Sequence, residues 1–292
     1  MDTRAFVMGV AFALFWGSAF SSARIIVQDA PPLAALSLRF LISGLIALAV
    51  AWATGRIRPM SPARWRAVVL FGICQNGLYL GLVFVAVQDI EASVAAIVAS
   101  TMPLLVAFAS AVLLSERLGW TGYGGILAGF IGVGLVLTTR ITGQATVFGI
   151  GLCVVSVLSL TVATLTIRSL DVRDNMFQVI GLQMLVGSAA LFPFAFLFES
   201  WTVSWSLPLG LAFAYTTFVP GLIATWFWFI LVERIGATRA ATYHFLHPFF
   251  GVATAAVLLG ESLSPLDIAA VAIIMGGILA VQRSRRDLHR RA

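Results

Sequence analysis

Ten uncharged, apolar runs divide this chain, and most are long enough to cross a lipid bilayer as a helix. A membrane-spanning helix needs roughly 20 consecutive apolar residues. The composition agrees, with 60% hydrophobic and 10% charged residues and a mean hydropathy of +1.02, whereas an ordinary water-soluble domain has about a quarter charged residues. The runs cover residues 5–23, 40–55 with an apolar lead from residue 33, 67–88, 92–115, 118–140, 141–167, 175–198, 200–232, 240–260 and 268–282. The sequence therefore predicts an all-α integral membrane protein with ten transmembrane helices.

The connections between these runs are short and rich in turn-forming residues, as at residues 28–32 and 58–62. Such connections are typical of neighbouring helices that pack closely. The first run is too long for the apolar part of a signal peptide and nine more follow, so we expect it to be retained. Cys74 and Cys153 lie inside apolar runs and are interpreted as buried hydrophobic residues.

The positions of the arginines predict the orientation in the membrane. All 18 basic residues are arginine, and short cytoplasmic loops are enriched in Arg and Lys. With a cytoplasmic N-terminus, fifteen arginines fall in cytoplasmic segments, only Arg140 falls on the outer side, and Arg24 and Arg39 lie within the first two spans. Both termini are therefore predicted to be cytoplasmic. The basic tail, residues 283–291, is expected to contact anionic lipid, and no nucleic acid partner is predicted.

The two halves of the chain resemble each other when one is shifted by 145 residues. The shift aligns Pro103 with Pro248, Glu116 with Glu261, and the run 111–114 with 256–259. We interpret residues 1–140 and 141–292 as two repeats of five helices. Because five is odd, the second repeat enters the membrane from the opposite side. Inverted repeats around a central cavity are typical of secondary transporters, which expose a midplane site to each side in turn.

Several motifs resemble a known family. The run Trp16-Gly17-Ser18-Ala19-Phe20, the segment from Pro103 to Leu118, and its copy around Pro248 and Glu261 are similar to EamA-type members of the drug/metabolite transporter superfamily. Within it, the chain resembles bacterial inner-membrane exporters of aromatic amino acids of the YddG type. The resemblance implies ten helices around a central cavity, alternating access and an amino acid as solute.

The candidate substrate-binding residues are polar and aromatic side chains near the middle of the runs. They are Trp16, Gln75, Asn76, Tyr79, Ser100, Thr101, Trp226, Tyr243, His244 and His247. Tyr215 and Trp228 are further candidates for an aromatic lining, because flat rings bind apolar side chains at little entropic cost. The alternative for each polar residue is a hydrogen bond between helices.

Pro103 and Pro248 are predicted hinges, because each proline removes a backbone donor and frees a carbonyl one turn earlier. Arg24 and Arg39 are candidates for an outer mouth that attracts a carboxylate, or else they snorkel to the interface. Glu116 and Glu261 are expected to cap the helix that follows each of them.

Together these features predict a secondary transporter that exports small amphipathic metabolites, amino acids with aromatic or large apolar side chains first among them. No run carries a central carboxylate, which argues against a mechanism in which a buried glutamate exchanges protons for cationic drugs. The alternatives are an exporter of cationic drugs or other metabolites, a membrane-embedded enzyme, and a lipid-handling scaffold. The sequence shows no nucleotide motif or nucleophile constellation, and we predict no cofactor, no metal, and a monomer or homodimer.

Overall fold

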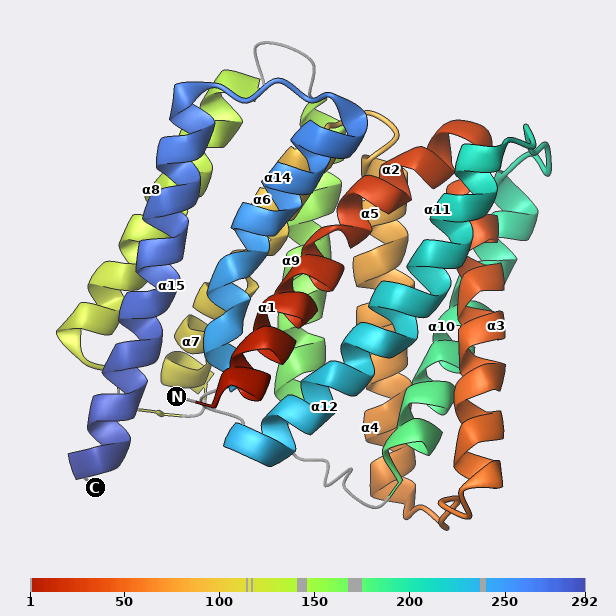
Figure 1. Cartoon of the computed structure of the whole chain (residues 1–292), viewed down its shortest axis with the longest axis horizontal. Helices are drawn as coiled ribbons and strands as arrows, with labels where there is room; N and C mark the ends of the chain where they lie inside the picture. The colour runs from red at the N-terminus through yellow and green to blue at the C-terminus, as the bar shows by residue number, and fades with distance from the viewer. Residues whose placement is uncertain are drawn as a thin grey trace. The chain divides into compact units, whose positions relative to one another are not determined.

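The computed structural model describes residues 2–113, 115–116, 118–140, 146–167, 175–236 and 240–291. These residues include ten helices long and apolar enough to cross a membrane (Figure 1), which confirms the predicted number. They are Thr3–Asp29, Pro32–Ala53, Pro62–Ala86, Ala92–Leu113, Trp120–Thr138, Val147–Thr166, Met176–Phe198, Leu207–Val232, Thr242–Leu259 and Pro265–Ser284. Residues 141–145 of the predicted sixth span, and the orienting arginines at 117, 168, 173 and 239, lie outside the described part of the chain.

Five of the spans are continuous α-helices, namely α3 (Pro32–Ala53), α8 (Trp120–Arg140), α9 (Val147–Ile167), α10 (Met176–Phe198) and α15 (Pro265–Arg291). Helix α3 begins at a proline, which needs no hydrogen-bond partner for its nitrogen at that position. Helix α15 begins before the predicted residue 268. Asp267 lies in its first turn and accepts hydrogen bonds from the backbone and hydroxyl of Ser264 at 2.8 and 2.9 Å. This charge therefore caps the helix instead of ending the span.

The other five spans are interrupted. The pieces are α1 (Thr3–Gly17) and α2 (Ala19–Asp29); α4 (Pro62–Phe71), the π-helix η1 (Gly72–Leu80) and α5 (Gly81–Ala86); α6 (Ala92–Ala99) and α7 (Met102–Leu113); α11 (Leu207–Phe218), the π-helix η2 (Val219–Ile223) and α12 (Ala224–Ile235); and the 3₁₀-helix η3 (Ala241–Leu246) and α14 (His247–Leu259). Inside a membrane, an interrupted helix needs other partners for its backbone groups. The hydroxyl of Ser18 supplies one, donating to the carbonyl of Phe15 at 3.0 Å.

Several boundaries differ from the predicted ones. The first span continues to Asp29, and the second begins at Pro32, so Arg24 and Arg39 lie within helices. The eighth span begins at Leu207 rather than at residue 200, because Ser206 caps the helix by accepting from the backbone nitrogen of Leu209 at 3.2 Å. A capping serine followed by proline within the first turn is a helix-start signal that hydropathy alone does not detect.

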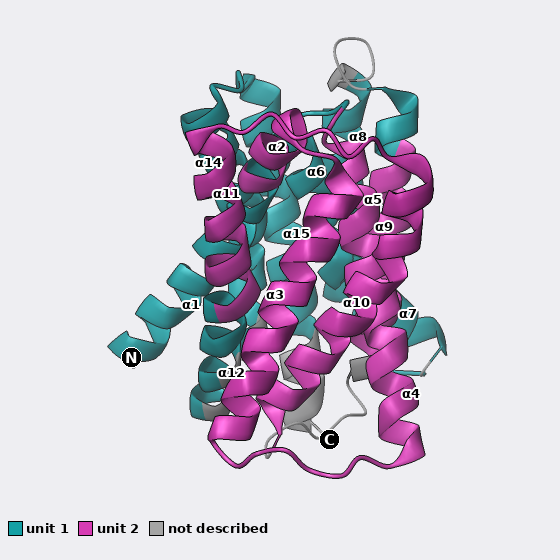
Figure 2. Cartoon of the chain, turned by 90° about the vertical axis from the view of Figure 1, so that its right-hand side faces the viewer, with its two compact units in different colours: residues 1–21, 89–150, 223–292 teal, residues 22–88, 151–222 magenta. Residues whose placement is uncertain are grey.

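The chain folds into two compact units, and each takes helices from both halves of the sequence (Figure 2). Unit 1 comprises Met1–Ser21, Asp89–Ile150 and Ile223–Ala292, and unit 2 comprises Ser22–Gln88 and Gly151–Leu222. The boundaries cross the first span just after its break at Ser18 and the eighth span within η2. The units are therefore not the two sequence halves.

Unit 1 is held together by close approaches between helices. A side chain at Gly277 of α15 would come within 2.5 Å of the Gly125 carbonyl of α8, and one at Gly251 of α14 would come within 2.5 Å of Ala96 of α6. Asp2 accepts from the backbone of Ala5 at the start of α1 and pairs with Arg234 near the end of α12. The Arg234 guanidinium holds the pKa of the Asp2 carboxyl below its ordinary value of 3.8.

Unit 2 is built around the pair α3 and α10. The hydroxyls of Ser37 and Ser188 lie 3.1 Å apart, and that of Ser188 also donates to the Ser37 carbonyl at 2.8 Å. Helix α9 joins η1 through Ser159, which donates to the carbonyl of Cys74 at 2.9 Å. Hydroxyl-to-backbone bonds of this kind commonly join membrane helices.

Candidate solute-binding site

Aromatic and imidazole rings gather in unit 1, in a group we call the aromatic–imidazole cluster: Phe12 and Trp16 of α1, Trp228 of α12, His244 of η3 and His247 of α14. The ring centroid of Phe12 lies 5.1 Å from that of Trp228, 5.5 Å from His244 and 5.4 Å from His247. The His244 and His247 centroids are 4.6 Å apart. Trp16 stacks on His247 at 6.0 Å with only 9° between the planes, so rings from four elements meet in one place.

Local backbone geometry brings these rings together. A side chain at Gly17 of α1 would come within 2.9 Å of the Gly251 nitrogen of α14, so the two helices approach closely beside the cluster. Near the middle of α1, Gly9 accommodates the ring of Tyr243, which a side chain there would meet at 2.4 Å. The 3₁₀ turn of η3 presents Tyr243 and His244 just before α14 begins at His247. Thus the three predicted residues of this segment do lie near α1.

The cluster combines apolar ring faces with nitrogen atoms that can exchange hydrogen bonds. The Nε2 atom of His247 is shielded from solvent and has no hydrogen-bond partner among the described residues. A buried polar atom without a partner is costly, so it is a natural contact point for a polar group of a solute. No group of three or more His, Cys, Asp or Glu residues that could hold a metal ion occurs in the described ranges.

Unit 2 has its own polar group at the middle of its helices. The Asn76 amide of η1 donates to the Gln183 carbonyl of α10 at 2.9 Å and also contacts the Gln183 side chain. Tyr79, one turn further along η1, is 2% exposed, and Gln75 is half-buried. Asn76 thus joins two helices, as the alternative interpretation of polar residues expected.

The two predicted outer-mouth arginines both bond to backbone carbonyls of unit 2. Arg39 is buried, donates through Nε to the Thr216 carbonyl at 3.1 Å, and covers the ring of Phe40. Arg24 donates to the carbonyl of Val87, at the end of α5. Arg39 therefore does not snorkel to the interface, because the end of α11 provides an acceptor inside the unit.

Five other predicted residues belong to the helix breaks or to a different surface. The hydroxyls of Ser100 and Thr101 donate to the Ile97 and Val98 carbonyls at 2.6 and 2.7 Å, which satisfies the break between α6 and α7. Pro103 and Pro248 each lie in the first turn of the helix segment after a break. Trp226 is 44% exposed and contacts the neighbouring Phe227 rather than the cluster.

Two glutamates cap helices that are distant in the sequence. Glu261 accepts from the backbone nitrogens of Ala92 and Ser93 at 2.8 and 3.0 Å, at the start of α6. The prediction that Glu261 caps the following helix is wrong, because Asp267 and Ser264 already cap α15. Glu199 holds the start of α3 in the same way, through Leu33 and Ala34 at 2.8 Å each. A carboxylate at a helix N-terminus is favoured by the helix dipole.

Sequence reasoning missed Phe12 of the cluster and Gln183 of the amide pair. Gln183 lies in the middle of an apolar run, so the criterion that selected Gln75 and Asn76 also applies to it. Phe12 is one of 22 phenylalanines and carries no polar atom. Only the packing of α1 against η3 and α14 distinguishes it.

Ten apolar helices, five of them interrupted within the span, are an arrangement typical of multi-pass membrane carriers of small solutes. The model of the EamA-like transporter family matches residues 3–138 and again residues 147–282. The chain belongs to the EamA-like transporter family and is a transporter, not an enzyme.

Relatives along nearly the whole chain are named as transporters. A protein of Archaeoglobus fulgidus named an uncharacterized transporter is 28% identical over 93% of this chain and 96% of its own. The inner membrane transporter YedA of Escherichia coli is 26% identical over 94% of this chain and 90% of its own. A solved crystal structure superimposes with a TM-score of 0.70 at 24% identity over 99% of both chains, which shows a shared fold.

Proposed function

We propose that the chain exports amino acids with aromatic or large apolar side chains across the inner membrane by alternating access, with both termini in the cytoplasm. The observation that carries this proposal is the aromatic–imidazole cluster of unit 1. Its ring faces suit a flat apolar side chain, and the His247 Nε2 atom can bond to the amino or carboxyl group.

The interrupted helices support the alternating-access part of the proposal. The third and eighth spans both contain a π-helix, and the fourth and ninth both break just before a proline. These are equivalent positions in the two proposed five-helix repeats, 1–140 and 141–292, and the family model also matches the chain twice. A duplicated set of weak points gives each repeat the same way to bend.

The absence of a carboxylate in the middle of any span favours amino acids over cationic drugs. Glu199, Glu261 and Asp267 are engaged in helix caps, and a permanently charged cation needs a buried counter-charge. A zwitterionic solute needs only polar groups at one end and apolar surface at the other.

Purified protein in liposomes loaded with labelled phenylalanine, threonine or methyl viologen tests the proposal. We expect phenylalanine to leave these liposomes faster than it leaves protein-free liposomes loaded in the same way. Methyl viologen should leave both at the same rate. Methyl viologen crossing while phenylalanine stays behind would replace the proposal with a drug carrier.

A pair of tryptophan variants tests whether the cluster is the site. Trp16→Ala removes a ring contact worth about 0.5–1.5 kcal/mol, so we expect the KM for phenylalanine to rise about two- to twelvefold. Trp120→Ala is the matched control, because Trp120 is 91% exposed at the start of α8. Equal KM values for the two variants would remove Trp16 from the site.

A further inference from the structure

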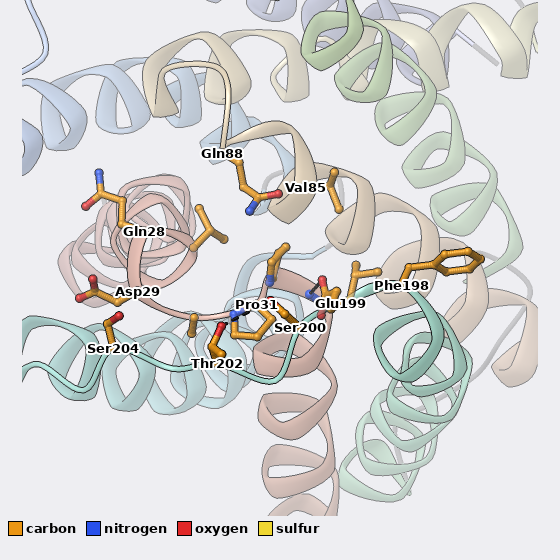
Figure 3. A pocket seen from close by; sticks show the side chains of 14 residues that line it. Gln28, Asp29, Pro31, Val85, Gln88, Phe198, Glu199, Ser200, Thr202 and Ser204 are labelled. Atoms are coloured by element: carbon orange, nitrogen blue, oxygen red, sulfur yellow. Dashed lines mark hydrogen bonds between the residues drawn. The ribbon is translucent and has the colours of Figure 1, made fainter.

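Unit 2 contains a pocket that has no part in the aromatic–imidazole cluster. It has a volume of about 530 Å³ and is open on one side. Its walls come from three places: the turn between α2 and α3, the end of α5, and the loop between α10 and α11 (Figure 3). Its lining residues include Gln28, Asp29, Gln88, Glu199 and Thr202. The volume suits a small organic solute.

Hydrogen bonds fix the walls of the pocket in place. Glu199 holds the start of α3 through two backbone nitrogens, and the backbone nitrogen of Ser204 donates to the Asp29 carbonyl at 2.8 Å. The hydroxyl of Ser206 donates to Oδ2 of Asp29 at 2.6 Å. The carboxylate of Asp29 is therefore held in one orientation before any ligand arrives, which lowers the entropic cost of binding.

The polar atoms of the pocket favour a positively charged group. Both Glu199 oxygens are engaged by backbone, but Oδ1 of Asp29 has no hydrogen-bond partner in the described part of the chain. The pocket is lined by two carboxylates and by no arginine or histidine. Such a site attracts an ammonium group and repels an unaccompanied carboxylate.

Two carboxamides supply the remaining recognition. No side-chain hydrogen bond involves Gln28 or Gln88 within the described residues, and Figure 3 shows Gln88 extending from the end of α5 toward the turn at Pro31. A carboxamide can donate to a carboxylate or accept from a hydroxyl. An ammonium group at Asp29 would thus leave the rest of a small solute facing amide groups.

We propose that this pocket is a binding site for the ammonium group of a small amine or amino acid, with Asp29 as the counter-charge and Gln28 and Gln88 as partners of the adjoining polar group. This proposal of an ammonium-binding pocket stands whichever solute the protein transports. The further role of the pocket, as a second station for a transported amino acid, rests on the proposed function.

A cysteine placed in the pocket reports binding directly. The two natural cysteines, Cys74 and Cys153, are buried, so Thr202→Cys introduces the one thiol that a maleimide reaches readily in the purified full-length protein. The labelling rate is measured by mass spectrometry with phenylalanine, phenethylamine or phenylpropionate present at millimolar concentration. We expect the two amines to slow labelling severalfold and phenylpropionate, which lacks the amine, to have no effect.

Two substitutions at Asp29 and one distant cysteine complete the test. In the Thr202→Cys background, Asp29→Asn keeps an acceptor for Ser206 but loses the charge, so protection should disappear, whereas Asp29→Glu should keep it. Ser262→Cys, exposed in the loop between α14 and α15, should show no protection.

Protection that survives Asp29→Asn, equal protection by phenylpropionate, or no protection by either amine overturns the site. If Asp29→Asn does not fold, loss of protection in Asp29→Glu serves as the overturning result instead. The liposome assay separates this proposal from the proposed function. Protection by phenethylamine without export of phenylalanine rejects the proposed function and keeps the pocket. Export of phenylalanine without protection by phenethylamine rejects the pocket and keeps the proposed function.

Discussion

Phe12 contacts every other ring of the aromatic–imidazole cluster and is 1% exposed. Replacing a large buried ring with alanine costs about 3–5 kcal/mol in tightly packed cores. We expect Phe12→Ala to lower the Tm by several degrees and to raise the KM for phenylalanine more than Trp16→Ala does, because all four neighbouring rings lose their support. Thermal unfolding in detergent and liposome transport measure the two effects.

Phe6 provides the control on the same helix, since it is 46% exposed. The substitution Phe6→Ala should change the Tm and the KM little. If Phe12→Ala behaved like Phe6→Ala, the cluster would be neither a packing centre nor a solute site.

Single residues show which features of the candidate site can be predicted from the sequence and which cannot. His244 and His247 are conspicuous in the sequence because polar groups are rare in apolar runs, and in the structure both rings lie beside Phe12 of α1. Arg39 was found for the same reason, but its partner, the Thr216 carbonyl, is 177 residues away in the sequence. A backbone acceptor carries no side-chain signal, so the sequence has no feature that reveals this bond.

At the scale of helices, Glu261 determines how α6 begins. Its carboxylate accepts from two backbone nitrogens that have no partner within the helix. Removing a side-chain cap costs about 0.5–2 kcal/mol, so Glu261→Ala should lower the Tm measurably. Glu261→Gln should have a smaller effect, because its amide oxygen can still accept from one nitrogen.

The neighbouring Ser262→Ala is the control for the cap, since it leaves the Glu261 carboxylate in place. If Glu261→Ala left the Tm at the wild-type value, the cap would contribute nothing to stability.

Two consecutive glycines of α15 make a sharper test of helix packing. A side chain at Gly277 would lie 2.5 Å from the Gly125 carbonyl of α8, whereas one at Gly276 would meet no atom within 4 Å. Overpacking costs about 1–3 kcal/mol, while alanine is favoured over glycine in a helix by about 0.5–1 kcal/mol. We expect Gly277→Ala to lower the Tm and Gly276→Ala to leave it unchanged or raise it.

Hydropathy was sufficient to predict all ten spans, but their interruptions were only partly predictable. Pro103 and Pro248 each lie in the first turn after the break in the fourth and ninth spans, so a proline in the sequence accompanies both interruptions. The π-helix of the third span, η1, contains no proline, and nothing in Gly72–Leu80 distinguishes it from an ordinary α-helix. The eighth span has Pro220 within η2, and a proline inside an apolar run is a sequence signal for an interrupted helix.

For the whole molecule, the distribution of arginines makes a topological prediction. Arg58→Cys lies after the second span and Ser262→Cys after the ninth, so a cytoplasmic N-terminus places them on opposite sides of the membrane. In intact cells, an impermeant maleimide should label the cysteine at 262 at once and that at 58 only after permeabilisation. Labelling of both from outside would reject the inverted arrangement of the repeats.

The interleaving of the two units imposes an order on biogenesis. When the ribosome has made the first 150 residues, two segments of unit 1 and one segment of unit 2 have been synthesised. Unit 2 still lacks Gly151–Leu222, and unit 1 still lacks Ile223–Ala292. Helix α3 is then in the bilayer before α10 is made, and the Ser37 hydroxyl lacks its partner until Ser188 is inserted. Unit 2 is completed first. Helix α1 remains without its partners α12 and α14 until the last helices leave the translocon. The N-terminal helix is therefore the part of the nascent chain that stays unpacked longest.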